Sequence, residues 1–197
     1  MTSGQVRQVA DEGTAVRALD IAERLVQTRG FNDVSYADVA GELGITKPSL
    51  HYHFASKAAL GDALIARYAS RFYAALEQIA AEEPDPRARL ARYADLYRRV
   101  LAAGRMCLCG ILAAEYQTLP DGMRAAVLEF FDRNEAWLVD VLRDGVSSGV
   151  LKAEEPLADV ARMIIDTLEG AVMVSRVRGD IGRFDQVASR LLASLAV

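Results

Sequence analysis

Two cysteines and two histidines are the side chains of this sequence best suited to covalent or metal chemistry. Cys107 and Cys109 are two positions apart, and so are His51 and His53. Residues two apart on a helix diverge by about 200°, so neither pair converges on one metal ion or one disulfide. We therefore expect no metal site and no cofactor, with both cysteines serving as small buried apolar residues. The alternative is a thiol sensor.

A second group of chemically capable side chains lies between residues 35 and 57, where hydroxyl, imidazole and ammonium groups alternate with apolar residues. Such groups donate hydrogen bonds to phosphates and base edges of DNA. Ser35 is a helix N-cap with Asp38 at the reciprocal position, Gly44 ends that helix, and Thr46 caps the next one. Two short helices across a tight turn predict a helix-turn-helix, whose second helix enters the major groove.

The elements that position these groups are expected to be helices throughout. Alanine and leucine are abundant, and apolar residues recur at helical spacing rather than alternating. We expect an all-α fold of nine helices: short ones opened by Ser35 and Thr46, a short apolar one over 107–117, and longer ones over about 12–29, 57–81, 86–103, 121–147, 156–178 and 184–195. The expected domains are a three-helix head, 12–56, which holds the helix-turn-helix, and a larger helical body, 57–197.

Charge and hydropathy restrict the class of protein. The formal net charge is −4, and residues 1–60 hold six Lys or Arg against seven Asp or Glu. A strongly basic nucleic-acid binder is therefore excluded, and any DNA contact depends on where a few groups lie. The polar N-terminus has no apolar signal region, and no apolar run approaches the roughly 20 residues of a membrane span. We expect a cytoplasmic protein with no membrane partner.

Within residues 15–64 an ordered set of positions forms a specific pattern: Gly30-Phe31, Val39-Ala40, Leu43-Gly44-Ile45, Leu50, His53-Phe54, Lys57 and Leu60. This set resembles the helix-turn-helix of the TetR/AcrR family of transcriptional regulators. One position departs from the family pattern, because the residue after Leu50 is usually tyrosine and here is His51.

The resemblance implies a homodimer that binds palindromic operator DNA. Carried over by position, Ser35 and Tyr36 would contact phosphates, and Thr46, Lys47 and Ser49 would face base edges or phosphates. His51, Tyr52 and His53 would lie near the DNA backbone, and Lys57 would bind a phosphate.

For the body, the resemblance implies dimerisation through about Pro156–Arg178 and Phe184–Leu195, although their apolar stripes are equally typical of an internal core. It also implies a pocket for an unidentified small-molecule effector, with Glu115 as a polar anchor or a solvated edge. The candidate pocket residues, each also compatible with plain core, are Tyr97, Met106, Cys107, Glu115, Phe131, Trp137, Met163 and Met173.

The expected function is that of a repressor released by a small apolar ligand. Some family members carry a reactive cysteine at the start of the corresponding helix, so an alternative is an electrophile-responsive repressor that senses through Cys107. An enzyme is a third hypothesis, but the sequence lacks a Ser/His/Asp arrangement, a phosphate-binding loop and a metal-ligand set.

Overall fold

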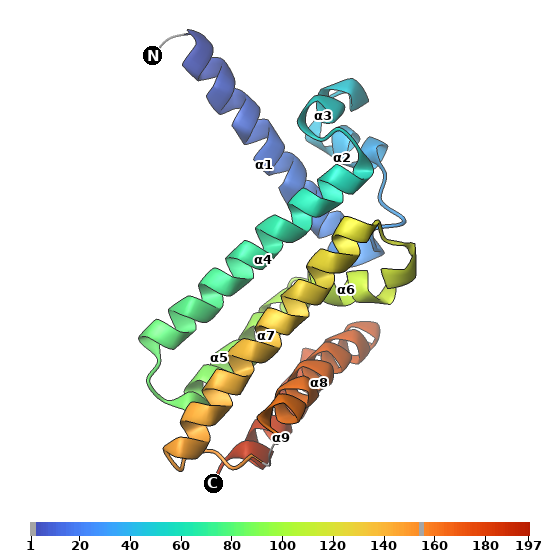
Figure 1. Ribbon diagram of the computed structural model, residues 1–197. Helices are drawn as coiled ribbons and strands as arrows, with labels where there is room; N and C mark the ends of the chain where they lie inside the picture. The colour runs from blue at the N-terminus through green and yellow to red at the C-terminus, as the bar shows by residue number, and fades with distance from the viewer. Residues whose placement is uncertain (1–2, 154–155) are drawn as a thin grey trace.

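The computed structural model describes the backbone of residues 3–153 and 156–197, and side chains from residue 13 onward. Over these ranges the chain forms nine α-helices, one 3-10 helix and no strand, so the expected all-α fold is confirmed (Figure 1). The helices are α1 (Ser3–Arg29), α2 (Tyr36–Leu43), α3 (Lys47–His53), α4 (Lys57–Glu82), α5 (Pro86–Ala102), α6 (Leu108–Ala114), α7 (Asp121–Ser147), α8 (Leu157–Arg178) and α9 (Ile181–Leu195), with the 3-10 helix η1 at Tyr116–Thr118.

The second half of α1, together with α2 and α3, forms a small head at one end of the molecule (Figure 1). Its centre is apolar, because Ala22, Val39 and Leu50, one from each helix, are at most 1% exposed. Two glycines turn the chain between the helices. Gly30 (φ +90°) follows α1 and Gly44 (φ +73°) follows α2, in the left-handed region that favours glycine.

The body is built around α5, which packs against α4, α7, α8 and α9. Figure 1 shows α4 and α7 running side by side away from the head, with α8 and α9 paired on the other side of α7. Large aromatic side chains fill the space between α5 and α7, where Tyr93, Tyr97 and Phe130 are fully buried. An isolated antiparallel bridge between Leu151 and Ala196 fastens the C-terminus to the segment after α7.

Head and body share one continuous apolar core through the first turns of α4. Leu60 and Leu64 are buried in this junction. Gly61 lies between them, and a Cβ there would overlap Met123 of α7 and Phe31 of the head. The division at residues 56 and 57 thus falls in a packed junction, and the expected two domains stay a prediction about function.

Some helix boundaries differ from those expected. Helix α1 begins at Ser3 rather than near residue 12, because the mostly polar sequence before residue 12 gives no clear apolar periodicity. Helix α9 begins at Ile181 rather than Phe184, since Asp180 caps it by accepting from the Arg183 N–H at 3.2 Å. Helix α6 ends at Ala114 and gives way to η1, so the expected helix over 107–117 is split.

Candidate DNA interface and effector pocket

Side-chain caps fix the start of both helices of the helix-turn-helix. Ser35 and Asp38 form a capping box at α2, with the Ser35 N–H donating to Asp38 Oδ2 at 2.8 Å. These hydrogen bonds from Ser35 hold the pKa of the Asp38 carboxyl below its ordinary value. At α3, Thr46 Oγ1 accepts from the Ser49 N–H at 3.3 Å and lies 3.0 Å from the Ser49 hydroxyl. The predicted N-caps are confirmed.

Tyr36 joins the two helices of the motif. Its hydroxyl donates to the Phe54 carbonyl at 2.5 Å, and its ring stacks on His51 with centroids 4.3 Å apart. His51 therefore has a structural contact at the position where it departs from the family pattern. These contacts orient α3 relative to α2. Because the Tyr36 hydroxyl donates to Phe54, a phosphate would have to compete with that carbonyl for the hydroxyl group.

The outer face of α3 presents polar and aromatic side chains to solvent. Lys47, Ser49 and Tyr52 are exposed, and the Tyr52 side chain is 78% accessible. Lys47 has no ion-pair partner among the residues that the structure describes. His53 is half-buried, and its ring meets Tyr52 edge-on at 5.5 Å. The α3 residues predicted from the sequence therefore lie on one exposed face, with the large ring of Tyr52 near the end of the helix.

Lys57, at the start of α4, folds back onto the head. Its ammonium donates to the Asn32 carbonyl at 3.2 Å and lies 4.6 Å from the centre of the Phe31 ring. Burial lowers its pKa from the ordinary lysine value, against the opposing effect of Glu115 and two aspartates. A phosphate would have to compete with these contacts for the ammonium group.

The acidic residues of the head are held in ion pairs. Asp20 and Glu23 of α1 bind Arg67 and Arg71 of α4, and Glu42 of α2 binds Arg24 of α1. Two of these three acids therefore face α4 rather than α3. Because these acids are paired with arginines, a nearly neutral head still presents the exposed cation Lys47 on its outer face.

Glu115, expected as a polar anchor for the effector, lies at the head instead. Its carboxylate accepts from the Phe31 N–H at 2.6 Å and the Asn32 N–H at 3.2 Å, just beyond α1. A Cβ on Gly30 would overlap this carboxylate, so the glycine makes the contact possible. Nearby, the Arg176 guanidinium donates to the Thr28 carbonyl at 2.7 Å. Body residues thus bind the free backbone groups at the end of α1.

Replacing Glu115 by alanine is expected to lower the free energy of unfolding by about 1–3 kcal/mol, because two charge-assisted hydrogen bonds to backbone N–H groups are lost. Chemical denaturation monitored by circular dichroism measures this. Glu129→Ala, which removes an exposed acid on α7, is the matched control and should change stability little. Equal effects of the two variants would show that the Glu115 contact does not stabilise the fold.

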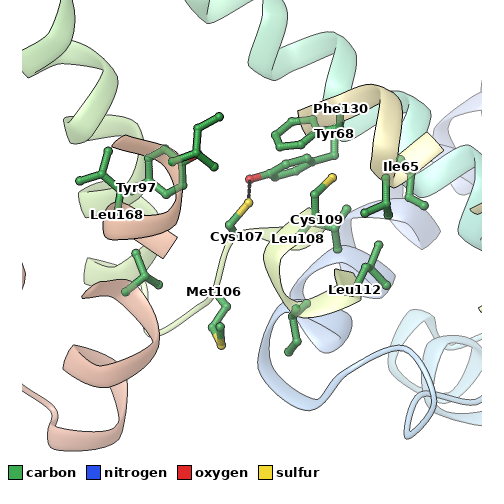
Figure 2. Packing of buried hydrophobic residues seen from close by; sticks show 14 of the residues in the cluster. Ile65, Tyr68, Tyr97, Met106, Cys107, Leu108, Cys109, Leu112, Phe130 and Leu168 are labelled. Atoms are coloured by element: carbon green, nitrogen blue, oxygen red, sulfur yellow. Dashed lines mark hydrogen bonds between the residues drawn. The ribbon is translucent and has the colours of Figure 1, made fainter. Parts of the chain in front are cut away.

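A recess of about 230 Å³ opens between α4, α5 and the start of α6. Its inner wall is formed by Tyr68, Phe72, Tyr97 and Cys107, and Arg71 and Arg99 stand at its rim. Figure 2 shows the Cys107 thiol pointing at the Tyr68 hydroxyl, which donates to the sulfur at 3.5 Å. The walls are mainly apolar and aromatic, as is typical of small-molecule sites.

Both cysteines are buried and free, as expected. Burial, together with the nearby Glu169 carboxyl, raises the pKa of both thiols well above the ordinary value. The groups that act on the Cys107 pKa are Glu169, Cys109 and Tyr68, none of them cationic. A reactive cysteine needs a stabilised, accessible thiolate. This geometry does not favour the alternative of a thiol sensor.

Comparison with known proteins decides the class. A model described as bacterial regulatory proteins of the TetR family matches residues 18–64, which include the helix-turn-helix. A tetracyclin repressor-like C-terminal domain matches residues 86–191, more than half of the chain. The chain belongs to the TetR family. It is a DNA-binding transcriptional regulator, and the family and its relatives are not enzymes.

This TetR-family chain is similar to curated and solved proteins over most of its length. It is 27% identical to the transcriptional regulator AcuR of Cereibacter sphaeroides, covering 88% of this chain and 82% of the relative. It is 27% identical to the repressor KstR2 of Rhodococcus jostii, covering 92% and 88%. The crystal structure of a TetR-family regulator from Agrobacterium tumefaciens matches with TM-score 0.92 and 28% identity, over 95% of this chain and all of the other.

The structure separates the predicted pocket residues of this TetR-family regulator into groups. Tyr97 and Cys107 line the recess, and Met106 is buried beside Cys107. Phe131 and Trp137, both on α7, are half-buried against the apolar core of the body. Trp137 stacks on the buried Tyr93 of α5. Three of the eight lie elsewhere: Glu115 at the head, and Met163 and Met173 on the exposed face of α8.

Sequence reasoning passed over residues that the fold brings to the recess. Tyr68 and Ala75 are each one turn from Phe72 on α4, and Leu96 and Val100 are one turn apart on α5. Their helical spacing is the signal that could have identified them. Glu169 was also missed, although an acid within the apolar stretch of α8 is itself a signal.

Other site classes receive no support from the described residues. No group of three or more His, Cys, Asp or Glu among them is arranged to hold a metal ion. His51 and His53 have separate ring contacts, with Tyr36 and Tyr52 respectively. Among the described helices none is long and apolar enough to cross a membrane.

Proposed function

We propose that this TetR-family protein is a repressor that binds a palindromic operator as a homodimer and releases it when a small, largely apolar effector enters the recess. The exposed face of α3, with its unpaired Lys47 and projecting Tyr52, is the observation that carries the proposal. KstR2, a relative of similar length, is named as a repressor. In this proposal residues 12–56 form the DNA-binding head and residues 57–197 the regulatory body.

The dimer is proposed to form on the outer face of α8. The apolar stripes expected from sequence for dimerisation, one on α8 and one on α9, mostly face the monomer core, as for Ile164 and Leu168 of α8 and Leu191 of α9. A different stripe faces solvent and is apolar. Its members recur at helical spacing with relative exposures of 40–85%: Met163, Met173, Val174 and Val177. Gly170, exposed between them, would let a second copy approach closely.

Two-fold symmetry of the protein imposes two-fold symmetry on the DNA site. The two α3 helices would enter successive major grooves, with half-sites about one helical turn, roughly 34 Å, apart or somewhat more. Selection of bound fragments from genomic DNA by the purified protein tests this. An inverted repeat in the selected fragments is the expected result, and a footprint without any palindrome would contradict the proposal.

The recess is proposed to reach the head by two routes. Cys107, in its wall, adjoins Met106, whose N–H donates to the Gln27 carbonyl of α1 at 3.1 Å. Tyr68 and Phe72 lie on α4, which continues to the head beside α3. A ligand that shifts either wall would change the separation of the two α3 helices. Its effect is limited to its differential affinity for the two states, typically about 1–3 kcal/mol.

Lys47→Ala is expected to weaken operator binding and alter sequence preference, by about 1–3 kcal/mol if Lys47 reads guanine. Lys57→Ala is expected to weaken binding to all sequences and to lower the salt slope by about 1, since a phosphate contact carries no base information. Fluorescence anisotropy with operator and random duplexes, over a range of salt, measures both effects. Thermal unfolding serves as a control, because Lys57 also contacts Asn32. If both variants changed operator and random binding equally, the two roles would not differ.

A further inference from the structure

A carboxyl group is buried directly behind the recess. Both oxygens of Glu169, on α8, are inaccessible to solvent and have no hydrogen-bond partner. Gly110 on α6 makes room for them, because a Cβ at that position would overlap a carboxylate oxygen. Burying an unpaired carboxylate is costly, and a buried polar group without a partner is rare in folded proteins. The fold thus buries an acid that no nitrogen or oxygen donor of the described chain satisfies, with only the weakly donating Cys107 thiol beside it.

The surroundings of Glu169 supply no positive charge. The groups that face it are neutral at neutral pH: Tyr68 of α4, Tyr93 and Tyr97 of α5, and Cys107 and Cys109 of α6. No lysine or arginine of the described chain forms an ion pair with it. Burial raises the pKa of the Glu169 carboxyl to about 7, with the Cys107 thiol opposing the shift. The site lacks the cation that would make an ionised carboxylate favourable there.

The recess and this carboxyl group have Cys107 as a common neighbour. Three residues, Tyr68, Tyr97 and Cys107, line the recess. The charge of Glu169 contributes to the raised pKa of each of them. The Cys107 sulfur accepts from the Tyr68 hydroxyl, as Figure 2 shows. The same thiol adjoins the Glu169 carboxyl. A rotation of this one small side chain would connect the recess with the carboxyl group. Aromatic faces in the wall would also attract a cation.

We propose that the recess binds a small organic cation, an apolar body bearing a protonated primary amine, with its ammonium group bound by the Glu169 carboxylate. This assignment rests on the proposed function, because it names the chemical class of the effector. An ammonium group brings both the positive charge and the hydrogen-bond donors that the carboxylate lacks. An anion of the same shape would meet an acid and no partner. The volume, below the roughly 300 Å³ of a drug-sized pocket, restricts the body to about the size of a single ring.

Calorimetric titration of the full chain with benzylamine, benzyl alcohol and benzoate tests the proposal, since these probes share a ring and differ in the charge of the polar group. Benzylamine is expected to bind most tightly, and benzoate not to bind. E169Q should weaken the binding of benzylamine by about tenfold or more, because the buried charge pair is lost. The affinity for benzyl alcohol should be nearly unchanged. E129Q is the matched control, since Glu129 is an exposed acid on α7, outside the proposed α8 interface. This control variant should bind all three probes with the affinity of the wild type.

Proton release gives a second, independent readout. At pH 6 Glu169 is largely protonated, so benzylamine binding should displace close to one proton, seen as a dependence of the enthalpy on the buffer. At pH 8, and in E169Q at either pH, no proton should be released. Absence of benzylamine binding, or equal binding to the wild type and E169Q, would overturn the proposal.

A separate anisotropy assay with operator DNA distinguishes this inference from the proposed function. Benzylamine binding that depends on Glu169 and also releases operator supports both. Such binding without operator release supports the cation site and contradicts the effector role assigned to the recess.

Discussion

The double variant Met173→Glu, Val177→Glu is expected to be monomeric and to bind its operator at least about a hundredfold more weakly than the wild type. Both side chains are exposed in the monomer, at 48% and 85%, so their replacement leaves the monomer core intact. Four carboxylates would face one another across the proposed two-fold interface. A monomer contacts only one half-site and loses the avidity of two linked heads, which typically contributes a factor of about 10²–10⁴.

Analytical ultracentrifugation and anisotropy measure the two consequences separately. Leu128→Glu is the control, because Leu128 on α7 is similarly exposed, at 52%, and lies outside the α8 stripe. It should stay dimeric and keep its affinity for operator. A double variant that remained dimeric would place the interface elsewhere. A monomeric variant with undiminished operator affinity would show that dimerisation is not needed for binding.

E169Q is expected to be more stable than the wild type at pH 8 by about 3 kcal/mol and no more stable at pH 4. The folded-state pKa of Glu169 is about 7, against an ordinary value of 4.5, a difference of 2.5 pH units at about 1.36 kcal/mol each. A raised carboxyl pKa means that the folded protein retains a proton that the unfolded chain has released. The stability of the wild type relative to E169Q should therefore fall as pH rises from 4.5 to 7, and then stay level.

Urea denaturation of both proteins at matched concentration, at each half unit from pH 4 to pH 8, gives this curve. E129Q provides the comparison, since loss of an exposed carboxylate outside the proposed interface should give a nearly flat difference. A flat difference for E169Q as well would mean that Glu169 is ionised without cost in the folded state.

The head was predictable because its signals are local. The Ser35 and Thr46 caps and the glycines after α1 and α2 each act within a few residues, so the sequence pattern alone places α2 and α3. The contacts that some side chains of this region make could not be predicted. The ammonium group of Lys57 folds back onto Asn32, which depends on how α4 packs against the turn after α1.

The body was predictable only as a set of helices. Periodicity shows that α8 has an apolar face, but a helix with two apolar faces does not reveal which one packs inside. Ile164 and Leu168 turned out to be core, and Met163 and Met173 face solvent. Glu115 illustrates the same limit, because its partners at Phe31 and Asn32 lie more than 80 residues away along the chain.

Gly110 and Glu169 have a consequence for how such regulators diverge. A Cβ at position 110 would overlap the carboxylate as it lies in the structure, so a larger residue there would displace Glu169 from this place. Among related sequences an acid at the position of Glu169 should be accompanied by glycine at that of Gly110. Sequences that lack the one should more often lack the other. The pair would therefore serve as a marker in genomes, separating regulators that respond to amines from those that have turned to neutral or anionic compounds.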